Sequence, residues 1–346
     1  MVIGPSSSHL QGPKEEIQHT NPITEMENQT LVKDFLLLGF SNLPEMKLAL
    51  FCMFLVLYIS TLTGNVLIIT LTRVDSQLDM PMYFFLSSLS FLEICYTSVT
   101  VPKMLINFLA KTNAISFPAC ATQLYFFISL GSIECTLLAV MAYDRYVAVC
   151  NPLCYPIVMN KAVCLRLVAG SWLSGFLNSA VHTGMTFHLP FCSSNQIQQF
   201  FCDIPPLLKL ACTDTHANEV VLFIFSGFYG LGSFLLTLIS YIHIISAVLK
   251  ISSSASRHKT FSTCTSHLIV VSLFFGTSFF MYLRPISKHS LGWESLVPVF
   301  YAIVTPTLNP IIYSLRNKEV KGALQKLIHR KMMLYKKTQF LKARFG

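Results

Sequence analysis

Long apolar runs separated by short polar segments form the main pattern along this chain. The runs that lack Asp, Glu, Lys and Arg altogether cover residues 48–72, 112–133, 167–202, 220–249, 260–283 and 295–315. A further run, residues 80–102, is interrupted by Glu93 alone. Because about 20 apolar residues cross a bilayer as a helix, the pattern predicts seven membrane spans. The run 167–202 is too long for one span, so we expect its helix to end near residue 186 and a loop to follow.

The composition supports a membrane protein. Hydrophobic residues make up 53% of the chain and charged residues 12%, whereas soluble domains carry roughly 25% charged residues. The net charge is +9, and the basic residues lie mostly in short segments between the apolar runs and in the tail. The aromatic residues lie inside the apolar runs instead. This distribution argues against nucleic-acid binding. The 11 cysteines include no Cys-x-x-Cys pair, which argues against a zinc or redox site.

The distribution of Lys and Arg predicts the orientation. If the N-terminus lies outside, the inner loops and the tail hold most of the basic residues. The positive-inside rule then predicts an extracellular N-terminus (1–47), a seven-span domain (48–315) and a cytoplasmic tail (316–346) in the plasma membrane. Residues 1–47 are polar and show no signal-peptide core. Asn28 begins an Asn-x-Thr sequon on the predicted outside, where we expect glycosylation.

Two acids interrupt the apolar runs, Glu93 and Glu134. A bare charge in the middle of a bilayer costs roughly 3 kcal/mol or more, so each carboxyl needs a proton, a partner or a cation. Asn65 and Asn309 are expected at a comparable depth. We predict one buried polar cluster, which either binds a sodium ion or forms a protonated network without an ion.

Several motifs stand at the ends of the predicted spans and match one family in order and spacing. They read PMYFFL at 81–86, MAYDRYVAVC at 141–150, SY at 240–241, KTFSTC at 259–264, SHL at 266–268 and PTLNPIIYSLRN at 306–317. From about residue 28 to residue 326 the chain resembles vertebrate odorant receptors, a family of rhodopsin-like (class A) G-protein-coupled receptors. The family usually has Asp where Glu93 stands and Ala where Thr260 stands. Residues 1–25 exceed its short N-terminus, so we expect them to be an upstream extension.

The resemblance implies an all-α membrane protein, a seven-transmembrane helix bundle followed by a short amphipathic helix. It implies a receptor for a small-molecule odorant that activates a stimulatory G protein of the olfactory type and raises cyclic AMP. A transporter or channel would need broken helices or a charged path, for which Glu93 and Glu134 are thin evidence. An enzyme is not expected, because His-Glu-x-x-His, Gly-x-Ser-x-Gly and Gly-x-Gly-x-x-Gly are absent.

The resemblance also assigns disulfides and switch residues. It pairs Cys120 with Cys202 and Cys192 with Cys212, which would pin a loop over the bundle. It places Arg145 in the activation switch, paired with Asp144 at rest and turned toward Tyr241 and the G protein on activation. Without the resemblance, Asp144 and Arg145 read as an ordinary interfacial ion pair. The full set of expected switch and coupling residues is Asp144, Arg145, Tyr146, Tyr241, His267, Asn309, Pro310 and Tyr313.

The ligand site is expected in the outer half of the bundle, where aromatic and apolar side chains with a few hydroxyls recur at helical spacing. The candidates are Phe127, Ile128, Gly131, Ser132, Asn178, His182, Leu222, Phe225, Ser226, Tyr229, Phe275, Ser278, Phe279 and Tyr282. Amine receptors that resemble this class have an acid where Phe127 stands, so an uncharged odorant fits better than an amine. Plain helix packing remains the alternative for each of these residues.

The tail after the last span is basic and amphipathic. Val320, Leu324, Leu327 and Ile328 are expected to face lipid, while Lys321, Lys326 and Arg330 meet headgroups. We therefore predict a short helix on the inner leaflet between residues 317 and 330.

Overall fold

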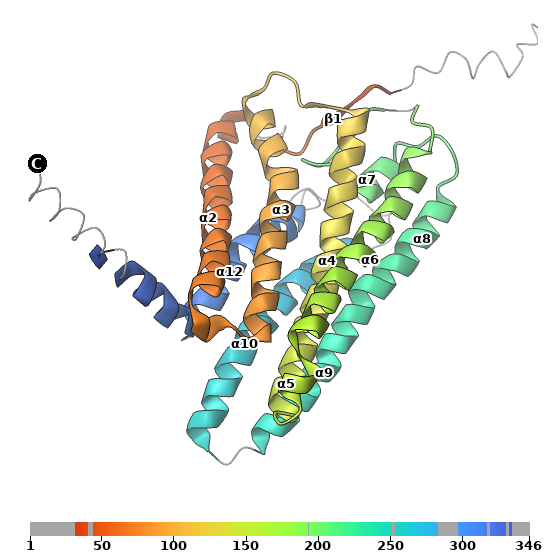
Figure 1. Ribbon diagram of the computed structural model, residues 1–346. Helices are drawn as coiled ribbons and strands as arrows, with labels where there is room; N and C mark the ends of the chain where they lie inside the picture. Colours follow the sequence, from red (N-terminus) through yellow and green to blue (C-terminus); the bar gives the residue numbers. More distant parts are fainter. Residues whose placement is uncertain are drawn as a thin grey trace, which may run out of the picture. The chain divides into compact units, whose positions relative to one another are not determined.

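The computed structural model describes residues 32–40, 44–192, 194–250, 253–282, 297–316, 319–329 and 332–333. For some of these residues, Tyr282 among them, the structure describes the backbone and not the side chain. The predicted glycosylation site Asn28 lies outside the described residues. Long helices lie side by side in the described part (Figure 1). The segments that correspond to the predicted spans are α2 (Lys47–Val74), α3 (Pro81–Leu109), α4 (Phe117–Cys150), α6 (Lys161–Phe187), α8 (His216–Ser226) with η3 (Gly227–Gly232) and α9 (Ser233–Leu249), α10 (Ser254–Tyr282), and α11 (Val297–Val299) with η4 (Phe300–Val304) and α12 (Thr305–Arg316).

The outer surface of the helices is apolar. The side chains of Leu48, Phe223 and Phe228, for example, are 70%, 69% and 71% exposed. Among the described residues, four helical segments are long and apolar enough by themselves to cross a membrane, namely Lys47–Val74, Pro81–Leu109, Phe117–Cys150 and His216–Leu249. Apolar side chains that point away from a packed interior are stable where lipid replaces water.

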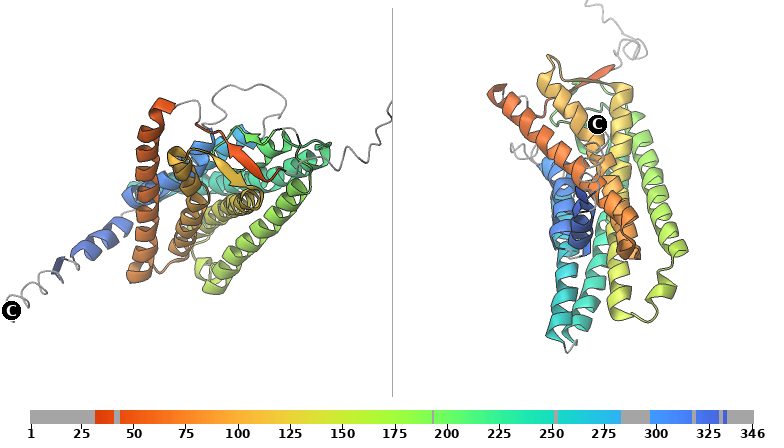
Figure 2. Two further views of the ribbon diagram at one scale, coloured as in Figure 1. Left: turned by 90° about the horizontal axis from the view of Figure 1, so that it is seen from above. Right: turned by 60° about the vertical axis from the view of Figure 1, so that its left-hand side comes forward.

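Helix α4 is the central element of the bundle, because α3, α6, α9 and α10 all contact it. The views in Figure 2 place α3 between α2 and α4. The contact with α6 is close at Gly175, where an added Cβ would lie 2.5 Å from Cγ1 of Ile133 and 2.7 Å from the carbonyl oxygen of Ser129. Glycine therefore sets how closely α4 and α6 approach. The end of α6 at Phe187 agrees with the expected end of the fourth span near residue 186.

A small three-stranded sheet supplements the helices and was not predicted. Strand β1 (Asp34–Leu37) pairs antiparallel with β2 (Ala114–Ser116) and parallel with β3 (Gln196–Ile197). The short helix α7 (Ile204–Leu208) packs in the same apolar cluster as the strands. Both expected disulfides, Cys120–Cys202 and Cys192–Cys212, are present. The strands, α7 and the disulfides together form a cap over one end of the bundle, which we call the disulfide cap.

The tail helix packs against protein more than was expected. Residues 319–329 are helical. Val320, expected to face lipid, is only 2% exposed and belongs to the core of the bundle, whereas Ile328 is exposed as expected. Lys326 donates to Asp75 and Gln77 of the α2–α3 connection, at 3.3 and 2.7 Å, rather than pointing only to headgroups. The backbone N–H of Gln77 and then Lys326 lower the pKa of Asp75, so this carboxylate is ionised at neutral pH.

Candidate functional site

A small cavity of about 110 Å³ lies among α4, α6, α8, η3 and α10, with one side chain from α3 and one from η4. Its lining residues are Tyr96, Phe127, Ile128, Gly131, Ser132, Cys135, Asn178, His182, Leu222, Phe225, Ser226, Tyr229, Gly230, Phe274, Phe275, Ser278, Phe279 and Tyr301. We call this space the bundle cavity. It is comparable in size to the cavity of ~150 Å³ that holds benzene in a well-studied protein core, so it suits a small molecule.

All the ligand-site candidates of the sequence analysis line the bundle cavity except Tyr282, whose side chain lies outside the description. The structure thus brings together residues of the third, fourth, fifth and sixth spans. It also adds Tyr96 from α3 and Tyr301 from η4, which the sequence analysis missed. Both lie in spans from which no candidate was drawn, although an aromatic residue at such a depth was a signal that could have been used.

Two π-helical turns shape the bundle cavity. η3 interrupts the fifth span and carries Tyr229 and Gly230, and η4 interrupts the seventh span and carries Tyr301. A π turn inserts an extra residue into a helix and rotates the residues that follow it, and such turns are frequent at functional sites. No periodicity argument based on 3.6 residues per turn predicts these rotations.

The polar atoms of the bundle cavity form a short chain of hydrogen bonds. The amide of Asn178 donates to the hydroxyl of Ser132 at 2.8 Å, and Ser132 donates to the carbonyl of Ile128 at 2.8 Å. The Asn178 side-chain oxygen has no partner among the described residues. His182 is 4% exposed and its ring meets that of Phe225 edge to face. Among the described residues, no Asp, Glu, Lys or Arg lines the bundle cavity.

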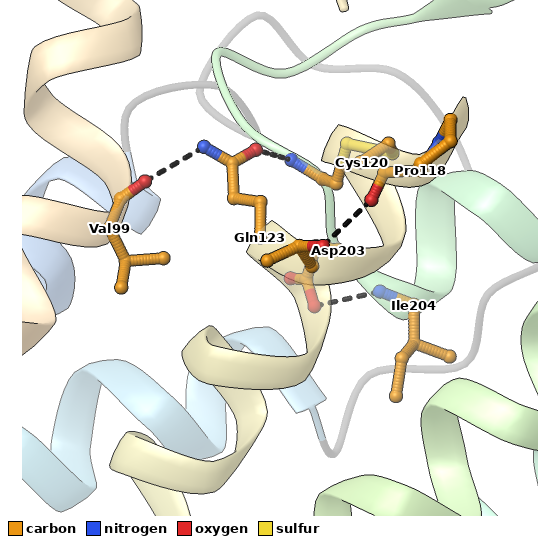
Figure 3. The surroundings of a disulfide bond; sticks show 8 residues. Val99, Pro118, Cys120, Gln123, Asp203 and Ile204 are labelled. Carbon is orange, nitrogen blue, oxygen red and sulfur yellow. Dashed lines mark hydrogen bonds between the residues drawn. A yellow bond between two sulfur atoms is a disulfide. The ribbon is translucent and has the colours of Figure 1, made fainter. Parts of the chain in front are cut away.

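Phe127 links the bundle cavity to the disulfide cap. Its ring lies 4.5 Å from that of Phe201, the residue before Cys202 of the cap, and 5.2 Å from that of Tyr96, centroid to centroid. Beside it, Gln123 donates to the carbonyl of Val99 and accepts from the backbone N–H of Cys202, both at 2.9 Å (Figure 3). One amide therefore ties α3, α4 and the disulfide together. The sequence analysis missed Gln123, since a single glutamine near a helix end carries no pattern.

The two buried acids differ in their surroundings. The amide of Asn309 in α12 donates to the carboxyl of Glu93 in α3, as the expected polar cluster requires. Glu134 is fully buried, and neither carboxyl oxygen has a hydrogen-bond partner among the described residues. These residues include no group of three or more His, Cys, Asp or Glu side chains placed to hold a metal ion. Thus Glu93 has a neutral partner, while Glu134 needs a proton or a cation, because no described residue gives its carboxyl a hydrogen bond.

At the other end of α4, the expected ion pair between Asp144 and Arg145 is not formed. The buried carboxylate of Asp144 instead accepts a hydrogen bond from the Tyr155 hydroxyl at 2.9 Å. Tyr155 lies in α5 (Tyr155–Val158), the short helix of the α4–α6 connection. Burial, and then the Asp144 carboxylate, raise the pKa of Tyr155, so its phenol remains the donor at physiological pH. Tyr155 of the connecting segment thus supplies the hydrogen bond to Asp144.

Arg145 shares a small cavity with His267 and Tyr313. Tyr241 contacts His267, and Tyr146 packs against the same apolar cluster as Tyr241. The structure therefore gathers Arg145, Tyr146, Tyr241, His267 and Tyr313 at one end of the bundle. Pro310 lies in α12 and packs against Gly64 of α2, where an added Cβ would be 2.9 Å from the Cβ of Pro310.

A bundle of long apolar helices around a small cavity, with no Asp, Glu, Lys or Arg among the described lining residues, is typical of a seven-transmembrane receptor. Residues 51–331 match the olfactory receptor family. The chain is 53% identical over 303 residues to olfactory receptor 5AP2 of Mus musculus and 52% identical over 301 residues to olfactory receptor 5AP2 of Homo sapiens, alignments that cover 88% and 87% of this chain and 96% and 95% of those proteins. It is also 52% identical over 303 residues to olfactory receptor 5A2 of Homo sapiens, covering 88% of this chain and 94% of that one. The chain belongs to the olfactory receptor family of G-protein-coupled receptors and is not an enzyme.

Proposed function

We propose that this olfactory receptor binds a small, uncharged volatile molecule in the bundle cavity and activates a stimulatory G protein of the olfactory type, which raises cyclic AMP. The observation that carries the proposal is the coincidence of the cavity with the residues that helical spacing placed in the outer half of the bundle. The size of the cavity, about 110 Å³, suits a ligand of a few heavy atoms. An apolar wall with a few directed polar groups is the usual form of a small-molecule site.

The lining argues for a neutral ligand that carries one hydroxyl or carbonyl group. A charged ligand would lose its hydration on entering the cavity and would find no counter-ion there, because the described lining contains no acid or strong base. Asn178 is 5% exposed and has an acceptor oxygen without a partner. A ligand hydroxyl would donate to that oxygen, and a carbonyl would instead accept from His182 or from a reoriented Ser132. The first of these bonds would satisfy an oxygen that is buried and has no partner among the described residues.

Signalling is assigned to the opposite end of the bundle. Arg145, with Asp144 and Tyr146 beside it, is placed as the switch that turns toward Tyr241 and the incoming G protein. Its position in one cavity with His267 and Tyr313 supports this assignment, since small rearrangements there change its partners. Asn309 and Pro310 are placed as a second switch in the last span, where proline removes one helical hydrogen bond and Asn309 bonds Glu93.

The proposed orientation puts the disulfide cap and Asn28 outside the cell and the tail inside. Disulfides persist in the oxidising extracellular environment, and both bonds lie in the cap. The basic side chains of the tail helix, such as Lys321, then meet the anionic inner leaflet. In the same orientation, Arg145 is at the cytoplasmic rim.

The test is cyclic AMP output in cells that express the receptor with the olfactory stimulatory G protein, challenged with a panel of neutral odorants. A response that depends on the G protein supports the proposal, whereas current or solute flux without G protein contradicts it. Arg145→Ala should abolish the response while the receptor still reaches the cell surface. Full signalling by this variant would show that Arg145 is not the switch.

A further inference from the structure

A second hollow lies on the outside of the bundle, separate from the bundle cavity. It has a volume of about 720 Å³. It is bordered by the last residues of α2, the first part of α3 and the first half of α6. The buried side chains of Tyr83 and Cys164 lie along it, and the exposed side chains of Phe84 and Leu165 border it. We call this hollow the α2–α3–α6 groove. No step of the proposed signalling mechanism uses it.

The groove has the length of one membrane leaflet. On α6 it extends from Lys161 to Trp172, and on α3 from Pro81 to Phe91. At ~1.5 Å per residue, each side measures roughly 15 Å, about half of the ~30 Å hydrocarbon core. The rings of Phe91 and Trp172, with centroids 5.8 Å apart, meet at the deep end. A guest that fills the groove therefore reaches from the rim of the membrane to its middle.

Charge is confined to the rim. Arg73, Lys161 and Asp79 lie there, whereas the deep half of the groove is bordered by aliphatic, aromatic and hydroxyl side chains. Lys161 and Asp79 form an ion pair of 3.3 Å that is largely exposed. Arg73 is exposed and has no ion pair among the described residues. The rim thus has one more cation than anion, and a guest with an anionic end would complement it.

We propose that the α2–α3–α6 groove binds a phospholipid whose headgroup carries a net negative charge. Its phosphate meets Arg73 and Lys161, and one acyl chain lies along Phe84 toward Trp172. An uncharged sterol hydroxyl would leave Arg73 without a partner, and a zwitterionic lipid offers less attraction to a rim of net positive charge. In the proposed orientation the guest belongs to the inner leaflet, where anionic lipids are concentrated. Only this leaflet assignment rests on the proposed function.

The test is native mass spectrometry of the full-length receptor in detergent with phosphatidylserine, phosphatidylcholine and cholesterol at equal concentration. We expect retained phosphatidylserine to exceed phosphatidylcholine. Arg73→Gln and Lys161→Gln should each lower its retention roughly fivefold, the factor expected for one basic side chain at an anionic membrane surface. Arg166→Gln is the matched control, because Arg166 is an exposed cation of α6, as Lys161 is, and does not border the groove.

A steric variant tests the groove independently of charge. Ser87 is half-buried in the groove wall, so Ser87→Trp should expel the lipid while both cations remain. Thermal unfolding of each variant shows whether the receptor is folded before lipid is counted. Equal retention of phosphatidylserine and phosphatidylcholine, an equal loss in Arg166→Gln, or preferential retention of cholesterol would each overturn the proposal. Because lipid is counted without ligand or G protein, failure here leaves the proposed signalling function untouched.

Discussion

The phenol oxygen of Tyr241 lies 2.9 Å from Nδ1 of His267, and the two buried rings stack with centroids 5.7 Å apart. The contact joins α9 to α10 at the end of the bundle that also holds Arg145. In the proposed mechanism Arg145 turns toward Tyr241, so Arg145 competes with His267 for a phenol that also donates to the carbonyl of Cys264 at 3.4 Å. His267 then holds Tyr241 in the state without G protein.

We predict that His267→Phe raises cyclic AMP in the absence of ligand. The substitution keeps an aromatic ring in place but removes the hydrogen bond, which leaves Tyr241 available to Arg145. A hydrogen bond of this kind contributes a net 0.5–1.5 kcal/mol, roughly, which corresponds to a rise of about two- to tenfold in the active population. The measurement is basal cyclic AMP normalised to the number of receptors at the cell surface.

Two further variants separate this explanation from a general loosening of the bundle. Tyr241→Phe removes the same bond and also the partner of Arg145, so its maximal response to ligand should fall. Ser246→Ala is the control, because Ser246 is exposed and its hydroxyl donates to the carbonyl of Ile242 in the same helix. Basal signalling that stays at the wild-type level in His267→Phe would show that His267 restrains nothing.

Gln123 should stabilise the receptor through its two hydrogen bonds to Val99 and Cys202. Gln123→Leu keeps the volume but leaves the Val99 carbonyl and the Cys202 N–H without their side-chain partner. A buried N–H left unpaired, as that of Cys202 would be, costs about 1–3 kcal/mol, so we predict a lower thermal midpoint and fewer receptors at the surface. Thr122→Ala is the control, since Thr122 is exposed and its hydroxyl donates to the carbonyl of Pro118 in the same helix. An unchanged midpoint in Gln123→Leu would mean that the disulfide alone positions the cap.

The buried acids give a prediction about sodium. If Glu134 holds a cation with Glu93, then Glu134→Gln and Glu93→Gln should abolish any dependence of signalling on sodium concentration. If both carboxyls are protonated, the amide replaces the acid with little change. The measurement is the ligand dose–response in sodium and in choline media. Sodium dependence that persists in both variants removes the ion from this site, and protonation then explains how both carboxyls are buried.

The architecture follows from the sequence because lipid imposes a simple rule: each span must be a long apolar helix. That rule locates α6 to within a residue of its observed end. It fails where backbone pairing happens outside the membrane, as in the sheet of β1, β2 and β3, whose strands are too short to show a pattern.

Part of the cavity lining was predictable because it lies on regular helices. Phe127, Gly131 and Phe275 follow from helical spacing and resemblance, because each lies in a regular stretch of helix. Tyr301 does not, since the π turn η4 redirects it. The bond from Tyr155 to Asp144 was not predicted, because Tyr155 lies in the short helix α5 between two spans, and the periodicity of the spans says nothing about such a connection.

The size of the bundle cavity should limit the size of the ligand, and Gly131 offers a graded test. A Cβ added at Gly131 would lie 3.8 Å from the Tyr96 hydroxyl, which is ordinary contact, so Ala fits without movement of the backbone. Gly131→Ala should therefore weaken the potency of the largest active odorants about tenfold and spare the smallest. Gly131→Leu should fill the cavity and abolish ligand responses while basal signalling persists.

Gly170→Ala provides the matched control for this series. Both glycines lie within helices, where Ala stabilises the fold by roughly 0.5–1 kcal/mol relative to Gly. An added Cβ at Gly170 meets nothing within 4 Å, and Gly170 does not line the bundle cavity. Any change that comes from helix stability alone must therefore appear in both variants. If Gly131→Leu responds normally to the same odorants, the ligand binds outside the bundle cavity, and the proposed site is wrong.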